Sequence, residues 1–144
     1  IDKLGRRQLM YIGSFGYIIS LSLVSCAFFF QWGGLLIPIF LFLFIAAHAI
    51  GQGAIIWVFI SEIFPNHLRN AGQSFGTSVH WVLAAIIPSF VPLLFGSIGA
   101  GVVFLIFALF MALQLVFVHY MMPETRGISL EKLSKTLIEK KGPL

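Results

Sequence analysis

The chain has few charged residues: aspartate, glutamate, lysine and arginine together make up 10% of its 144 residues. Soluble domains carry about 25% charged residues. Between Arg7 and Glu124 the only two charges are Glu62 and Arg69. The basic residues therefore form no patch on a soluble face, and the net charge of +4 does not indicate a nucleic-acid partner. With 59% hydrophobic residues, the composition is that of a membrane protein.

Cysteine is also scarce, and no catalytic signature occurs in the structural context that it requires. The single cysteine, Cys26, excludes an internal disulfide and a metal site built from several cysteines. H-E-x-x-H does not occur, and no two carboxylates fall together inside an apolar segment. G-Q-S-F-G over residues 72–76 matches G-x-S-x-G, but it falls within a predicted membrane span and not at the strand-to-helix turn that this motif requires. His48 and His80 have no further ligand at a suitable spacing for a shared metal ion. We therefore expect a protein that is not an enzyme and needs no metal or cofactor.

Four apolar runs are each long enough to cross a membrane. A helix rises 1.5 Å per residue, so about 20 residues cross a hydrocarbon core of about 30 Å. The pattern predicts an all-α membrane protein with spans over residues 8–30, 35–64, 71–95 and 102–122. Pro88 and Pro92 should bend or break the third span, and the fourth, rich in phenylalanine and leucine, should face lipid.

The basic residues predict the orientation of these spans. All of them fall in the N-terminal lead, in the connection between the second and third spans, or in the C-terminal tail. In a four-span chain these places lie on one side of the membrane, and the positive-inside rule assigns that side to the cytoplasm. We expect a cytoplasmic loop over residues 1–7, a transmembrane part over 8–127 and a cytoplasmic amphipathic helix with tail over 128–144. The protein would be multi-pass in the cell membrane, with both termini cytoplasmic.

The first three spans carry small or polar residues inside their apolar length. In the first span, small residues recur at helical spacing with one tyrosine among them, which favours close helix packing; the set is Gly13, Ser14, Gly16, Tyr17 and Ser20. The second and third spans hold polar and tryptophan side chains at mid-membrane depth: His48, Gln52, Gly53, Trp57, His80 and Trp81. Such residues face protein or water and not lipid. The pattern alone leaves two interpretations open: contact with a small polar solute, or helix packing through buried hydrogen bonds.

Three motifs resemble those of the sugar porters in the major facilitator superfamily. D-K-L-G-R-R over residues 2–7 is similar to the family's loop between helices eight and nine. G-Q-G-A-I-I-W over 51–57, with S-E-I-F-P-N-H-L-R over 61–69, is similar to the tenth helix and the loop after it. P-E-T-R-G over 123–127 is similar to the signature after the twelfth helix. The resemblance implies a C-terminal fragment of a twelve-helix transporter, with helices nine to twelve and a short cytoplasmic helix.

The resemblance also implies roles for individual residues. Trp57 and Gly53 match tenth-helix positions beside bound sugar, and His80 with Trp81 matches an eleventh-helix pair that is usually an amide followed by tryptophan. His48 matches a cavity-facing position that is often aromatic. Gln52 stands where the family often has proline. Unlike proline, its amide side chain could supply a hydrogen bond to the sugar. The charged residues match a cytoplasmic network that bridges the two transporter halves when the gate is shut; they are Asp2, Arg6, Arg7, Glu62, Arg69 and Glu124.

The implied function is transport of a hexose, pentose or related polyol by alternating access, as a proton symporter or a uniporter. The partners would be the sugar, the lipid bilayer, the N-terminal half of the same transporter and, for a symporter, protons. The alternative is a free-standing four-span scaffold or assembly protein, in which tryptophans and charges only join helices. Because a charge near the membrane needs a partner, we predict that Glu62 pairs with Arg69, Arg6 or Arg7.

Overall fold

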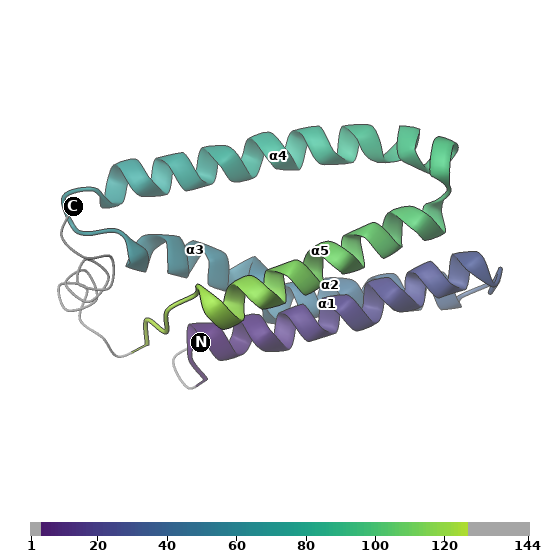
Figure 1. Cartoon of the computed structure of the whole chain (residues 1–144), viewed down its shortest axis with the longest axis horizontal. Helices are drawn as coiled ribbons and strands as arrows, with labels where there is room; N and C mark the ends of the chain where they lie inside the picture. Colours follow the sequence, from purple (N-terminus) through teal and green to yellow (C-terminus); the bar gives the residue numbers. More distant parts are fainter. Residues whose placement is uncertain (1–3, 127–144) are drawn as a thin grey trace.

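The computed structural model describes residues 4–126, so Asp2 and the amphipathic helix expected over 128–144 lie outside the described residues. The described chain is helical (Figure 1). Its helices are α1 (Arg6–Phe29), α2 (Leu36–Ile50), α3 (Gln52–Ile63), α4 (Arg69–Ile98) and α5 (Ala100–Tyr120). With α2 and α3 taken together, they provide four helices long and apolar enough to cross a membrane. This confirms the predicted all-α membrane fold with four spans.

The second span is interrupted at its central glycines. Gly51 has φ −101° and ψ −103°, which lies outside the helical range and divides the span into α2 and α3. The break lies against α1, where a Cβ on Gly51 would come within 2.6 Å of the Gly13 Cα. Two facing glycines therefore allow the two backbones to touch, as expected for the small residues of the first span.

The third span is one continuous helix and is longer than predicted. Helix α4 continues through Pro88 and Pro92 and is not broken at either of them, so of the predicted bend or break only the bend stays a prediction. Membrane helices tolerate proline because neighbouring groups can satisfy the freed carbonyls. The helix also ends later than expected, at Ile98, and only Gly99 separates it from α5. Gly99 has φ 83°, a conformation that glycine adopts without a Cβ clash, so one residue is enough for the reversal.

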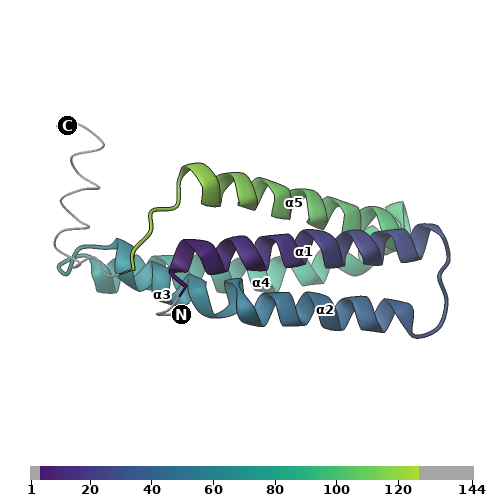
Figure 2. The same cartoon turned by 90° about the horizontal axis from the view of Figure 1, so that it is seen from below.

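Helix α1 lies between α5 and α2, as Figure 2 shows, and packs along both. The contact with α5 buries Val103, Ala108 and Val118, and the Ser25 hydroxyl donates to the Gly101 carbonyl oxygen at 2.7 Å. The fourth span, expected to face lipid, exposes large apolar side chains such as Leu105, Leu109 and Leu113 on one side and packs against α1 on the other. Helix α4 contacts α3 and α5 but neither α1 nor α2 within residues 4–126.

Candidate functional site

A cavity of about 360 Å³, lined by residues from each of the helices α1 to α5, lies near the break between α2 and α3. Its volume is in the range of small-molecule sites. It is lined by Met10, His48, Gln52, Gly53, Ile56, Trp57, His80, Gln114 and Phe117. The structure thus brings together five of the six residues proposed from sequence as substrate-binding. The sixth, Trp81, does not line this cavity; it is 62% exposed and contacts the ring of His80.

The aromatic wall of the cavity joins α3 to α4. The ring of His80 meets the indole of Trp57 edge-on, with centroids 4.9 Å apart and planes at 74°. On its other side it meets Trp81 at 5.4 Å and 82°. Edge-to-face packing is the favoured geometry for such rings, so each ring restrains the next. The arrangement presents a flat indole and an imidazole to the same space.

The polar wall is formed by two side chains that are also tied to α1. His48 bonds through Nδ1 to the phenol oxygen of Tyr17. The Gln52 Nε2 donates to the Ser14 hydroxyl at 3.2 Å, while its Oε1 is buried and has no hydrogen-bond partner within residues 4–126. Gln52 therefore directs its amide toward α1, and this contact matches the packing interpretation of that residue.

A second polar cavity, of about 500 Å³, lies between α3 and α4 on the side of Trp57 toward Glu62. Trp57 and Ile60 line it from α3, and Gln73, Ser74, Thr77 and Ser78 line it from α4. These polar residues of the third span thus face the neighbouring helix and a cavity, as such residues do in membrane helices. Trp57 belongs to both cavities and separates them.

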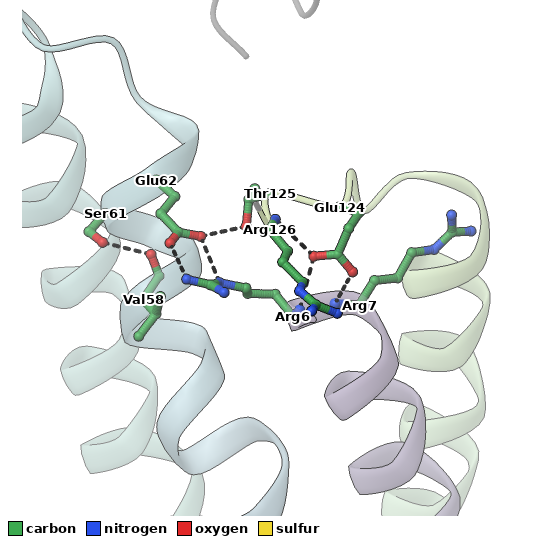
Figure 3. A network of polar contacts seen from close by, with 8 residues as sticks. All are labelled: Arg6, Arg7, Val58, Ser61, Glu62, Glu124, Thr125 and Arg126. Atoms are coloured by element: carbon green, nitrogen blue, oxygen red, sulfur yellow. Dashed lines mark hydrogen bonds and ion pairs between the residues drawn. The ribbon is translucent and has the colours of Figure 1, made fainter. Parts of the chain in front are cut away.

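Four charged residues of the predicted network lie at the end of the bundle where α1 begins and α3 ends (Figure 3): Arg6, Arg7, Glu62 and Glu124. The Arg6 guanidinium donates to both carboxylate oxygens of Glu62, at 2.8 and 3.2 Å. The Thr125 hydroxyl donates to the same carboxylate. Two-pronged contacts of this kind are among the stronger hydrogen bonds in proteins. The prediction that Glu62 pairs with an arginine is confirmed, with Arg6 as the partner.

The carboxylate of Glu124 binds backbone N–H groups at the start of α1. Its carboxylate accepts the backbone N–H groups of Arg6 at 3.0 Å, Arg7 at 3.2 Å and Arg126 at 3.1 Å. The first N–H groups of a helix lack intrahelical partners and attract negative charge. Glu124 therefore caps α1 from 118 residues away. This cap explains why α1 begins at Arg6 and not at the expected residue 8.

The other two arginines of the predicted network have different partners. Arg7 Nε donates to the Val118 carbonyl oxygen at 3.1 Å, and its Nη2 donates to the His119 carbonyl oxygen. Arg7 thus covers the carboxyl end of α5, where a positive charge is favourable. Arg69 donates to the Asn66 side chain at 2.6 Å, within the connection between α3 and α4. Neither contact tests the proposed gating role.

The residues that sequence reasoning missed at these sites include three polar ones. Thr125 was seen only as part of a motif, although its hydroxyl binds Glu62. Tyr17 was assigned to packing, although its phenol reaches the cavity-lining His48. Gln114 lines the cavity from α5, and its polar side chain in an otherwise apolar run was the available signal. Contacts between segments distant in sequence, which no local pattern encodes, identify the first two.

Comparison with known proteins agrees with these features. The sequence profile of the family described as "Sugar (and other) transporter" matches residues 1–137. The arabinose-proton symporter of Bacillus subtilis is 39% identical over 140 residues, which cover 96% of this chain and 30% of that protein. The D-xylose-proton symporter-like 2 of Arabidopsis thaliana is 35% identical over 134 residues, which cover 92% and 27%.

A solved structure shows the same arrangement of helices. The inward-open xylose transporter XylE from E. coli matches with a TM-score of 0.89 at 29% identity, over 94% of this chain and 31% of that protein. The chain thus spans less than a third of the length of these relatives. A profile match over nearly the whole chain, with helices that follow a transporter of this superfamily, establishes the family. The chain belongs to the sugar porter family of the major facilitator superfamily.

Proposed function

We propose that this chain forms helices nine to twelve of a sugar transporter and supplies one side of its substrate site. The observation that supports this most directly is the cavity that gathers His48, Gln52, Gly53, Trp57 and His80 from three helices. Aromatic faces pack on the C–H surfaces of a sugar, and imidazole and amide groups bond to its hydroxyls. The relatives named for arabinose and xylose suggest a pentose as the first substrate to try, with a hexose next.

The transport cycle would be alternating access, in which the two halves rock about a site near the middle of the membrane. The contacts among Arg6, Glu62, Thr125 and Glu124 lie at one end of the bundle, on the side that carries the basic residues. We place this end in the cytoplasm by the positive-inside rule. Epitope tags inserted at Gly33 and at His67 test the orientation: only the second should need membrane permeabilisation for antibody access. The reverse result would invert the topology.

The substrate site is tested in the complete transporter that contains this chain. We would measure uptake of radiolabelled L-arabinose, D-xylose and D-glucose by cells that lack their own transporters for these sugars. Loss of an indole face costs roughly 1.5–3 kcal/mol of apolar contact. Trp57→Leu should therefore reduce uptake at low sugar concentration roughly tenfold or more.

Trp32→Leu is the matched control, because Trp32 lies in the turn between α1 and α2 and outside the cavity. It should retain the uptake of the parent protein. If Trp57→Leu transported all three sugars as well as Trp32→Leu, the proposed site would be wrong, and the scaffold interpretation would be favoured.

A further inference from the structure

The contact between Tyr17 and His48 joins the helix core to the wall of the cavity. Tyr17 is only 6% exposed, and its ring packs with Leu21 and Ala108 and against Phe44, at a centroid distance of 4.9 Å. His48 is exposed and lines the cavity, which Tyr17 does not. The phenol ring is therefore held by packing, and the imidazole is the partner free to adjust.

The hydroxyl of Tyr17 has one polar partner within residues 4–126, the Nδ1 of His48. A buried phenol that loses its partner carries a desolvation penalty, so this bond fixes the rotation of the imidazole ring. In the neutral ring one nitrogen donates and the other accepts. Whichever tautomer is present, Nδ1 is occupied by Tyr17 and Nε2 remains available.

The second ring nitrogen lies over the glycine of the cavity wall. A Cβ on Gly53 would lie 2.9 Å from the His48 Nε2, closer than real Cβ contacts allow. Gly53 therefore leaves the space that this orientation of the imidazole needs. Tyr17 therefore contacts the ring at Nδ1, and Gly53 lies next to Nε2 in the wall of the cavity that His48 and Gly53 both line.

We propose that Tyr17 is a positioning residue for sugar recognition: it holds His48 so that Nε2 exchanges a hydrogen bond with one sugar hydroxyl. This inference rests on the proposed function. It assigns a role in substrate selection to α1, a helix that supplies only Met10 to the cavity wall. A site that is built to bond a hydroxyl discriminates against sugars that lack it, because its polar group is then left unpaired.

The test removes the hydroxyl and keeps the ring. In the complete transporter, Tyr17→Phe preserves the packing against Phe44 and deletes only the bond to His48. We expect the KM for the preferred labelled pentose to rise about 2- to 10-fold, the effect of one hydrogen bond, with the maximal rate unchanged. Preference for that pentose over its deoxy analogue lacking the recognised hydroxyl should fall by the same factor. KM does not depend on the amount of transporter, so partial loss of folded protein does not hide the result.

Tyr120→Phe is the matched control, because Tyr120 is 79% exposed and lies outside the cavity. It should leave KM unchanged. In a His48→Ala background, Tyr17→Phe should have no further effect on KM, because it acts through that imidazole. An equal rise in both backgrounds, or no rise in either, would overturn the positioning role. If Trp57→Leu and His48→Ala still impair uptake in that case, the proposed sugar site survives and only this inference fails.

Discussion

The guanidinium of Arg6 and the carboxylate of Glu62 form a two-pronged ion pair that joins the first turn of α1 to the last turn of α3. The side chains are 12% and 19% exposed, so water screens the pair only in part. Thr125 binds the same carboxylate from the segment that follows α5. Three segments that are distant in sequence are therefore held together through one acidic side chain.

Loss of the charge on Glu62 should weaken this junction. Glu62→Gln keeps the size of the side chain but cannot pair with Arg6 as a carboxylate does. We expect the free energy of unfolding in detergent micelles to fall by about 1–3 kcal/mol. If the junction belongs to the cytoplasmic gate, the rate of sugar exchange should change as well. Unchanged transport kinetics would contradict the gate assignment.

A double-mutant cycle tests which arginine is the partner of Glu62. Arg6→Gln and Glu62→Gln should show a coupling energy of about 1 kcal/mol or more, since each removes the same contact. Arg69→Gln is the control, because Arg69 donates to Asn66 and makes no hydrogen bond to Glu62 in the described chain. Its cycle with Glu62→Gln should be additive within about 0.5 kcal/mol. A larger coupling energy with Arg69 than with Arg6 would mean that Glu62 pairs with Arg69 in the membrane.

The cap that Glu124 places on α1 should control the stability of that helix end. Glu124→Gln removes the negative charge from three backbone N–H groups and should cost about 1–2 kcal/mol. The effect should be local, so hydrogen exchange of the Arg6 and Arg7 amides should become faster by roughly tenfold. Exchange at the middle of α1, for instance at Leu21, should remain unchanged. Equal acceleration at both places would indicate a general loss of stability and no specific cap.

Gly5 combines two requirements that can be separated by matched variants. Its φ is 83°, and a Cβ there would lie 2.7 Å from the Glu124 Oε2. Gly34 has φ 73° but open space around it, and Gly33 has open space without a positive φ. The melting temperature should therefore fall most for Gly5→Ala and less for Gly34→Ala, which carries only about 1–2 kcal/mol of backbone strain. Gly33→Ala should leave the melting temperature unchanged. An equal decrease for Gly5→Ala and Gly34→Ala would show that contact with Glu124 does not contribute to the effect at Gly5.

His80 tests whether the cavity is linked to protons. Its ring lies edge-on against Trp57 and Trp81, which suggests a contact residue. We expect His80→Asn in the complete transporter to raise the KM for sugar and to leave the shape of the pH–uptake profile unchanged. His67→Asn, at an exposed position between α3 and α4, is the control. A flattened pH profile for His80→Asn alone would instead support a proton-linked role, because histidine changes charge near neutral pH.

Much of the fold could be predicted because it depends on local composition. The length and apolarity of each run determine how many times the chain can cross the membrane. The second predicted span, residues 35–64, is the longest and has Gly51 near its centre, where glycine favours the irregularity that divides α2 from α3. The effect of Pro88 and Pro92 could not be predicted in the same way, since the loss of a backbone bond need not break a membrane helix.

The sequence by itself determined the number of spans, the family motifs and the residue types available for a sugar site, because hydrophobicity and side-chain chemistry belong to each residue. Only the tertiary structure decided the partners. Glu62 could have paired with any of three arginines, and the packing of α1 beside α3 selected Arg6. Tyr17 looked like a packing residue until α1 was placed next to the break in the second span, where its hydroxyl meets His48. Such contacts depend on which helices are neighbours and at what depth, and no short stretch of sequence specifies either.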